Sequence, residues 1–412
     1  MFRRRADAQV RPYTIAVLAL ILTSASFAQT RSADWPQWRG PTRDGAVLSF
    51  TPPNAWPDAL TRKWKVSVGI GYATPVLIGN RVYMFSRRGD NEVLAAIDAT
   101  SGKEVWATSY PAAFNLNSAA ARHEKGPKST PAFANGVVYT LGMTGIVTAF
   151  NAADGAKKWQ TPAPKKTPIY HTAMSPLVDR GLVIAHDDAA LAAFDPQTGV
   201  VKWRWAGDRP AYGSPIAGNF GGVRQVICLS DQNIVGVDET SGALLWKLPF
   251  RTEYDQNAIT PTVYGDTLIV SGLEKGVTAI RPVKRGTGWT ADAVWHNDDA
   301  SLYMTNGVIV RDTFVAMSHK NSGQFFALDA RTGKTLWKSA PRQASNAAIS
   351  HAGDLLFMLK DDGELLIGRA STTAFEPAKR YTVADSATWS APAIAGNRLF
   401  VKDTASLTLW TW

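Results

Sequence analysis

The stretch Ala96-Ile97-Asp98-Ala99-Thr100-Ser101-Gly102-Lys103-Glu104-Val105-Trp106 contains the pattern that decides the fold. An Asp or Asn is followed four residues later by Gly, and four residues after that by Trp. The pattern occurs five times with unchanged spacing, beginning at Asp98, Asn151, Asp195, Asp238 and Asp329. A unit that returns about every 40–50 residues is typical of propellers and solenoid arrays.

Each unit has the pattern of a small antiparallel sheet. In residues 73–110, short runs rich in β-branched and aromatic residues are separated by turn signals such as Gly79-Asn80. Such runs predict a four-stranded meander. Asp or Asn can accept hydrogen bonds from main-chain N–H groups of the turn. Gly can take a positive φ there, and Trp on the outer strand can cover a large apolar area of the next sheet.

Eight inner strands can be counted along the chain. They are expected to begin near Pro75, Pro131, Pro176, Pro215, Pro261, Asn306, Ile349 and Pro392. The last unit stops after three strands, and residues 62–68, with Trp64, supply the missing outer strand. Pairing the two ends of the chain closes the ring and removes exposed sheet edges.

The sequence therefore predicts an all-β protein, a single eight-bladed β-propeller of four-stranded antiparallel blades over residues 62–412. An N-terminal strand completes the last blade. The fifth unit has a longer basic turn at 282–288, and Tyr381 takes the Trp position of the seventh. The tryptophans expected to dock one blade on the next are Trp64, Trp106, Trp159, Trp203, Trp246, Trp295 and Trp337.

Residues 1–28 have the pattern of a secretory signal peptide. Basic residues precede an apolar stretch at 15–22, and Ser26-Phe27-Ala28 fits a small-x-small cleavage site. The alternative is a membrane anchor, but the apolar stretch is far shorter than the ~20 residues of a span. We expect a periplasmic or secreted protein with an N-terminal extended segment at 29–61. No transmembrane anchor is expected, and no lipobox cysteine follows the cleavage site.

Charge and cysteine content exclude several classes. The chain carries 44 basic and 34 acidic residues, a formal net charge of +10. No dense Lys/Arg tract occurs, so we expect no nucleic-acid partner. Cys228 is the single cysteine, lies in an apolar run and is expected to be a small buried hydrophobe. No catalytic or metal motif is recognised, so neither catalytic nor metal-ligating residues are assigned.

The most informative positions for binding lie at one mouth of the central channel. Three residues before each inner strand stand Tyr72, Lys128, Ala173, Tyr212, Ala258, Tyr303, Asn346 and Trp389. His171, Asn257 and the loop 115–128, with Arg122, His123 and Glu124, are expected on the same rim. An aromatic, concave mouth with a few polar groups is a candidate site for a ligand or partner. The alternative is that these aromatic residues only pack between blades.

The repeat resembles that of the pyrroloquinoline-quinone (PQQ)-type propellers, clearest at Ala96-Ile97-Asp98, Ala193-Phe194-Asp195 and Ala327-Leu328-Asp329 with their tryptophans. One branch comprises PQQ- and calcium-dependent dehydrogenases, whose alcohol-oxidising members usually carry a disulfide between adjacent cysteines. A single cysteine excludes that disulfide here, and Trp389 is the only candidate to stack on a quinone. The other branch is the non-enzymatic propeller subunit of outer-membrane assembly machinery, the BamB type, which binds no quinone.

The sequence favours a secreted or periplasmic, non-enzymatic scaffold that binds a protein or envelope partner and is a monomer without a cofactor. One alternative is a small dehydrogenase of alcohols or sugars that uses PQQ with calcium. The other is a binder of small ligands or glycans at the channel mouth.

Overall fold

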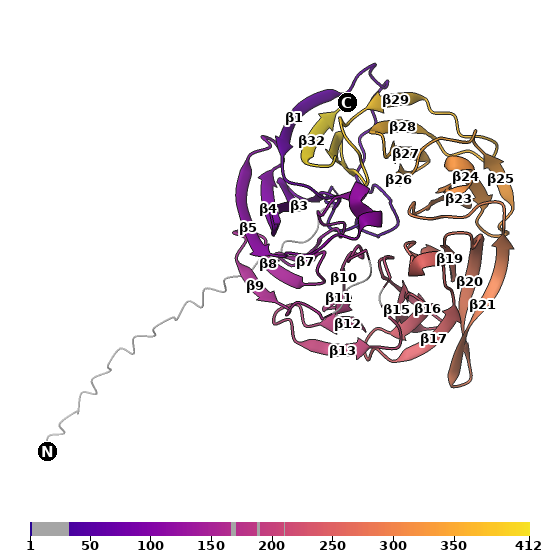
Figure 1. The fold of residues 1–412 in the computed structure, drawn as a ribbon, viewed down its shortest axis with the longest axis horizontal. Coiled ribbons are helices and arrows are strands. Elements are labelled where there is room, and N and C mark those ends of the chain that lie inside the picture. The colour runs from indigo at the N-terminus through magenta and orange to yellow at the C-terminus, as the bar shows by residue number, and fades with distance from the viewer. Residues whose placement is uncertain (2–32, 166–169, 188–189, 210) are drawn as a thin grey trace.

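The computed structural model describes residues 1, 33–165, 170–187, 190–209 and 211–412. The predicted signal peptide lies almost entirely outside them. Figure 1 shows a closed ring of antiparallel sheets around a central axis, which confirms the eight-bladed propeller. Within the described residues, no helix combines the length and apolar character needed to cross a bilayer.

Each blade is a four-stranded meander that runs from the channel to the outside. The first four blades are β2 (Val76–Ile78), β3 (Arg81–Arg88), β4 (Asn91–Asp98) and β5 (Glu104–Pro111); β6 (Ala132–Ala134), β7 (Val137–Leu141), β8 (Val147–Asn151) and β9 (Lys157–Gln160); β10 (Leu177–Asp179), β11 (Leu182–Asp187), β12 (Ala190–Phe194) and β13 (Val201–Trp205); and β14 (Ile216–Phe220), β15 (Val223–Leu229), β16 (Asn233–Asp238) and β17 (Leu244–Pro249).

The second half of the ring repeats this order and uses the first strand of the chain to finish the last blade. Its blades are β18 (Thr262–Tyr264), β19 (Thr267–Ser271), β20 (Val277–Arg285) and β21 (Gly288–Asn297); β22 (Val308–Val310), β23 (Thr313–Ser318), β24 (Gln324–Asp329) and β25 (Thr335–Lys338); β26 (Ala347–Ala352), β27 (Leu355–Lys360), β28 (Glu364–Arg369) and β29 (Lys379–Thr382); and β30 (Ala393–Ala395), β31 (Arg398–Lys402), β32 (Ser406–Thr411) and β1 (Thr61–Ser67). Three short 3₁₀ helices lie in loops: η1 (Ser118–His123), η2 (Glu253–Asp255) and η3 (Lys320–Ser322).

The predicted ring closure is confirmed, because β1 pairs antiparallel with β32 from Thr61 opposite Thr411 to Ser67 opposite Ser406. The middle strands are buried along their length, as in β3, whereas outer strands such as β5 are largely exposed. Neighbouring blades cover both faces of a middle strand, so the central residues of β3, Val82 to Phe85, are all apolar and do not alternate.

The inner strands are fastened to one another by a belt of side-chain acceptors around the channel. The backbone N–H of Thr74 donates to Thr130 Oγ1 (3.0 Å), and that of Thr130 donates to Ser175 Oγ (3.0 Å). The series continues through Ser214 and Thr260 to Asn306 Oδ1, at 2.8–2.9 Å. We call Thr130, Ser175, Ser214, Thr260 and Asn306 the inner belt; it joins the first six blades in sequence.

The repeated turn fastens the blades at the outside. The Asp195 carboxylate accepts the N–H groups of Gln197 and Thr198 at 3.0 Å, as the sequence predicts. The indole N–H of Trp159 donates to the carbonyl of Pro196 in the next blade (3.0 Å). Four other tryptophans donate to a carbonyl of the following blade in the same way: Trp64, Trp203, Trp295 and Trp337.

Three outer positions differ from this arrangement: Trp106, Tyr381 and Trp246. The Trp106 ring lies against Gly155 of the next blade, but its buried indole N–H finds no partner among the described residues. Tyr381 donates to the carbonyl of Pro57 (2.6 Å), so the N-terminal segment replaces the missing turn of the last blade.

Trp246 shares a buried apolar cluster with Leu268 and Val270 of the next blade, but its hydrogen bond differs from that of the other docking tryptophans. Its indole N–H donates to Gln225 of its own blade (2.7 Å), because blade 5 has no Asp-x-x-x-Gly turn to receive it. The predicted turn at 282–288 is instead a continuation of β20 and β21, paired as far as Arg285 opposite Gly288.

The inner strand of blade 7 begins at Ala347, two residues before the predicted start.

The glycine of the repeated turn predicts a stability difference between two matched variants. Gly199 (φ +72°) and Gly181 (φ +76°) have similar positive φ angles. A Cβ at Gly199 lies 2.6 Å from the Trp159 ring, whereas a Cβ at Gly181 meets nothing within 4 Å. We expect Gly181→Ala to cost about 1–2 kcal/mol from backbone strain, and Gly199→Ala about 1–3 kcal/mol more from overpacking. Urea unfolding measures both, and equal losses would contradict docking of the ring on the glycine.

The turn carboxylate predicts a pH dependence. Hydrogen bonding to Lys202 and then to the turn N–H groups lowers the pKa of Asp195 to about 2, from a usual value of 3.8. A lowered pKa in the folded state contributes stability that is present above pH ~4 and lost as the pH falls towards 2. The difference in unfolding free energy between the wild type and Asp195→Asn should therefore shrink over that range. Asn151→Asp, at the equivalent turn, should introduce the same dependence; a flat difference in both would refute it.

Candidate functional site

One cavity, of about 310 Å³, lies at the mouth of the channel where the inner strands begin. All eight positions that the sequence placed three residues before the inner strands line it: Tyr72, Lys128, Ala173, Tyr212, Ala258, Tyr303, Asn346 and Trp389. Each blade therefore contributes a side chain from the equivalent place, and the sequence spacing was sufficient to find them. Their role in binding stays a prediction.

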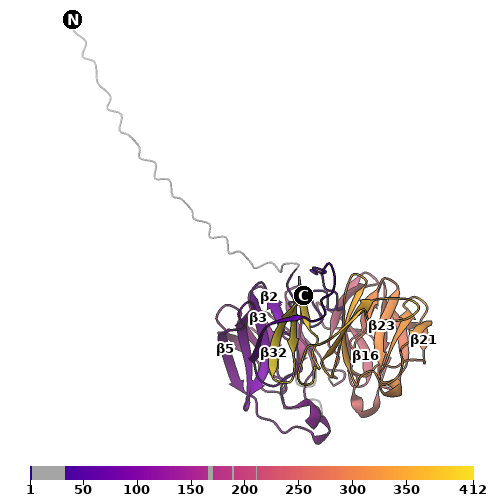
Figure 2. The same ribbon diagram turned by 90° about the horizontal axis from the view of Figure 1, so that it is seen from above.

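The N-terminal segment closes the cavity on the side that faces away from the loop carrying η1. Its backbone forms bridges with three blades, through Trp35 to Leu77, Ala46 to His351 and Phe50 to Gly396. Figure 2 shows the segment at one mouth of the ring and the loop carrying η1 at the other. Trp38 of this segment lines the cavity. The expected extended segment thus also supplies part of the site.

Two buried arginines lie behind Trp38. Their guanidinium carbons lie 5.5 Å (Arg39) and 5.8 Å (Arg43) from the Trp38 ring centroid. They donate to backbone carbonyls of Gly307 and Pro176, so they tie the segment to blades on different sides of the channel. Burial lowers the pKa of Arg39 to about 10 and that of Arg43 to about 9. Both remain protonated at neutral pH.

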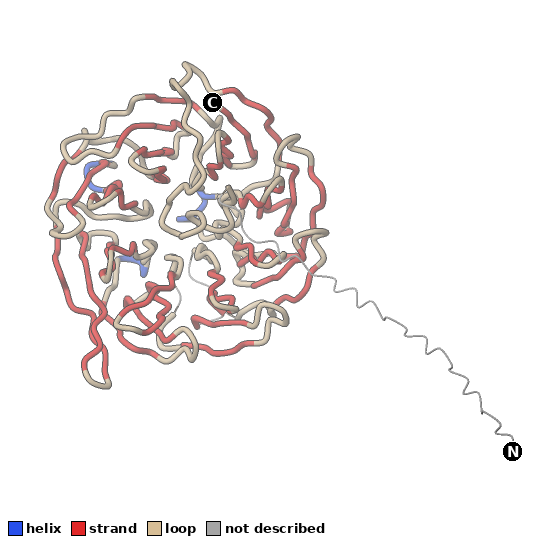
Figure 3. The backbone as a smooth tube through the Cα atoms, turned by 180° about the vertical axis from the view of Figure 1, so that it is seen from behind, coloured by secondary structure: helices blue, strands red, loops and turns tan. Residues whose placement is uncertain are grey.

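Helix η1 covers the other side of the cavity, near the axis of the ring when the molecule is seen from behind (Figure 3). Arg122 lies over the Trp389 ring at 5.5 Å, and the His123 ring contacts the same indole edge-on at 4.4 Å. Burial, followed by the charges of Arg122 and Lys128, lowers the pKa of His123 to about 4. His123 is therefore neutral at physiological pH.

Lys128 is one of two cationic residues in the cavity wall, the other being Arg122. The Lys128 ammonium group lies 3.9 Å from Met143 Sδ, and no carboxylate among the described residues forms an ion pair with it. Burial lowers the pKa of Lys128 to about 8. A largely buried ammonium without a carboxylate partner is costly unless another group stabilises its charge.

Three residues that were expected on the rim, Glu124, His171 and Asn257, do not line the cavity. His171 Nε2 lies 3.0 Å from the carbonyl oxygen of Asn115, and its ring packs on Phe114 at 4.2 Å. Asn257 is fully buried and donates through Nδ2 to the carbonyls of Ser230 and Phe250, both at 2.7 Å. Its side chain shapes a loop and is not exposed to a ligand.

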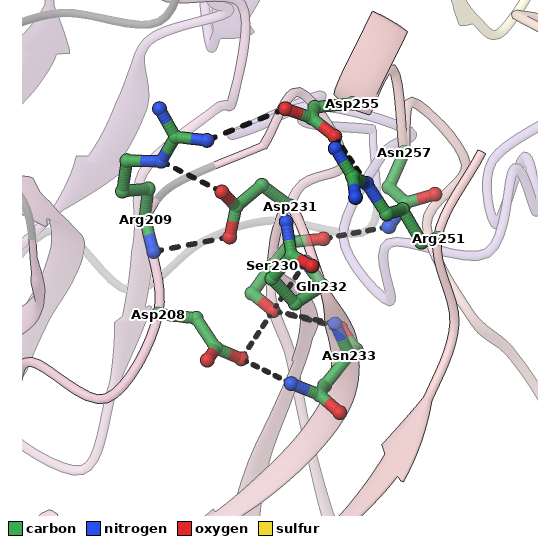
Figure 4. A network of polar contacts seen from close by, with 9 residues as sticks. All are labelled: Asp208, Arg209, Ser230, Asp231, Gln232, Asn233, Arg251, Asp255 and Asn257. Atoms are coloured by element: carbon green, nitrogen blue, oxygen red, sulfur yellow. Dashed lines mark hydrogen bonds and ion pairs between the residues drawn. The ribbon is translucent and has the colours of Figure 1, made fainter. Parts of the chain in front are cut away.

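That loop belongs to a polar network at blade 4, drawn in Figure 4. Arg209 donates to Asp231 (2.8 Å) and Asp255 (3.3 Å), which joins the segment before Tyr212 to η2. The side chain of Asp208 accepts from Ser230 and Asn233, both at 2.7 Å. The network holds the backbone that carries Tyr212 and Gln256 into the cavity wall.

Several lining residues were missed by the sequence reasoning. They are Trp38, Tyr170, Ser214, Gln256, Thr260, Met304 and Asn306, whereas Ala119 and Ala120 of η1 belong to the loop 115–128 that was expected on the rim. Ser214, Thr260 and Asn306 carry a usable signal, because they occupy the Ser/Thr/Asn position directly before the inner strands. Trp38 and Tyr170 lie outside the repeat, so no periodicity marks them.

The cavity does not fit a calcium-held quinone. Calcium prefers several oxygen ligands, carboxylates above all. No Asp or Glu lines the cavity, and the described part of the chain holds no group of three or more His, Cys, Asp or Glu able to bind a metal ion. Trp389, the stacking candidate, is covered by Arg122 and His123. We derive no step through PQQ.

Comparison with known proteins identifies the family to which this chain belongs. The family model described as outer membrane protein assembly factor BamB matches residues 89–339 and 294–411. This chain belongs to that family of PQQ-like propellers. Among its curated relatives, the BamB of Yersinia pestis is 25% identical over 364 residues, which span 83% of this chain and 86% of that protein.

Solved structures agree on the fold. BamB from Moraxella catarrhalis superposes with a TM-score of 0.60 at 18% identity, over 86% of this chain and all of that one. A quinohemoprotein alcohol dehydrogenase from Comamonas testosteroni has a TM-score of 0.58 at 14% identity, over 94% of this chain and 81% of that one. At these identities the likeness shows the architecture alone.

The environment of Lys128 predicts an unusual titration. With a pKa of about 8, Lys128 should lose its proton more than two pH units before an ordinary lysine at about 10.5. After reductive ¹³C-methylation, its NMR resonance should titrate near pH 8, and Lys128→Met identifies that resonance. A transition near 10.5 would contradict the buried environment.

Proposed function

We propose that this protein is a non-enzymatic scaffold of an outer-membrane protein assembly system and acts in the periplasm. Membership of the BamB family is the observation that carries the proposal. The cavity adds to it, since the lining holds no carboxylate and the described residues offer no metal-binding group for the dehydrogenase alternative.

Protein binding is assigned to the outside of the ring. The rim residues line a cavity between η1 and the N-terminal segment, which leaves them poorly placed for a large partner. The outer strands, in contrast, present unpaired backbone edges, which can accept a further strand from another protein.

The β20–β21 hairpin is the outer surface that best fits a partner. β21 has ten residues and is the longest outer strand of the described blades. The hairpin projects beyond the ring in Figure 1. Val294 on it is 40% exposed, and Arg281 and Arg285 lie on the paired strand. Trp289 packs against Gly221 of blade 4, so the projection is held in place by its neighbour.

The test compares two exposed valines on outer strands in the native host. Val294→Asp changes the hairpin, and Val105→Asp, at a residue 45% exposed on blade 1, is the matched control. After mild crosslinking, the tagged wild type should co-purify with the barrel-forming component of the outer-membrane assembly machinery. Val294→Asp should reduce that recovery by at least about tenfold, a loss of about 1.4 kcal/mol, and Val105→Asp should not.

A deletion strain supplies the functional measurement. Loss of the gene should lower the amount of folded β-barrel proteins in the outer membrane, and the Val105→Asp protein should restore it. Dye reduction by the purified chain with PQQ and calcium would contradict the proposal. An unchanged outer membrane together with absent co-purification would also refute it.

A further inference from the structure

We propose that the channel cavity is a metal-free binding site for a small organic anion with a planar aromatic body, such as an aromatic carboxylate. This inference goes beyond the scaffold role and rests on the chemistry of the lining. Three independent observations support it: the charge of the surroundings, the supply of hydrogen-bond donors and the aromatic walls.

The charged residues of the cavity lining are basic. Lys128 and Arg122 line the cavity, and Arg39 and Arg43 lie behind the Trp38 ring. None of these four cations has an ion-pair partner among the described residues. Because the Lys128 ammonium group is largely buried, its charge attracts an anion more strongly than it would at an exposed surface.

The polar groups of the lining are arranged as donors. Asn306 Oδ1 already accepts the N–H of Thr260 (2.8 Å), and Asn346 Oδ1 accepts the hydroxyl of Thr305 (2.8 Å). The Tyr303 hydroxyl donates to Gln256 Oε1. In each case the oxygen is engaged within the protein, and the amide NH₂ is the group that remains for a ligand. A carboxylate can accept from several such donors at once.

Aromatic rings supply the rest of the wall. They are Trp38, Tyr72, Tyr170, Tyr212 and Tyr303, whereas the Trp389 ring is covered by Arg122 and His123. The Tyr212 hydroxyl accepts the backbone N–H of Tyr170 (3.2 Å), and the centroids of the two rings lie 6.2 Å apart. A planar apolar body can stack on such faces. The volume of about 310 Å³ is at the lower end for ligand pockets, about 300–1,000 Å³, and therefore selects a small molecule.

The experiment measures binding to the purified mature protein in EDTA, by calorimetry and thermal shift. The probes are benzoate, isophthalate and trimesate, each compared with the neutral amide of the same shape. At least one carboxylate should bind and raise the melting temperature, and its amide should bind at least about tenfold more weakly, as expected when hydrogen bonds to a charged group are lost. Inorganic phosphate tests whether charge alone is enough.

Two cavity variants and one control locate the site. Lys128→Met and Arg122→Gln should each weaken carboxylate binding by at least about tenfold. Lys247→Met, at an exposed residue of β17, should leave it unchanged. Arg122 is exposed on η1, so its variant reports on binding even where Lys128→Met does not fold.

Four results would overturn the proposal: no binding of any carboxylate, equal binding of the amides, binding that survives the folded cavity variants, or binding that requires Ca²⁺. If phosphate binds as tightly as the best carboxylate, the inference that the ligand has an aromatic body is wrong. The hairpin variants and the deletion strain test the scaffold role separately, so failure of one proposal is distinguishable from failure of the other.

Discussion

The structure depends on how the blades satisfy backbone N–H groups at the channel, where no further strand exists to receive them. A buried N–H without an acceptor costs as much as a lost hydrogen bond. The inner belt solves this by passing each N–H to a side-chain oxygen of the next blade, as Thr130 does for Thr74 and Ser175 does for Thr130. The same residues fix the angle at which inner strands enter the ring. In the first six blades they therefore help to place the rim positions that line the cavity.

The outer fastening is more variable than the inner one. Most docking tryptophans donate to the carbonyl that follows the turn Asp or Asn, but the chain tolerates exceptions where the neighbour has changed. The indole N–H of Trp246 donates to Gln225 of its own blade because blade 5 has a hairpin in place of the repeated turn. Tyr381 donates to the carbonyl of Pro57 because no turn connects β32 to β1 in the last blade. The hydrogen bonds of the outer strands thus differ near the chain termini and the hairpin, while the packing of apolar faces keeps the ring intact.

Much of this architecture could be predicted because the repeat has a fixed spacing. The register of Asp, Gly and Trp and the starts of the inner strands together predict the blade count, the closure through Trp64 and the eight rim positions. The spacing carries no information about segments outside the repeat. Trp38 enters the cavity through the path of the N-terminal segment, and Asn257 is withdrawn from it by carbonyl partners distant in sequence. Such placements depend on tertiary contacts that a single sequence does not display.

Closure of the ring by its two ends has a consequence for how the protein is made. β1 pairs with β32, so strands at residues 61–67 and 406–411 must meet before the last blade exists. Until the final residues are available, the nascent chain holds an open array with unpaired edges at both ends, and such edges favour association with other chains. A chain that crosses a membrane from its N-terminus would therefore complete its fold only after translocation has ended, and would need protection until then.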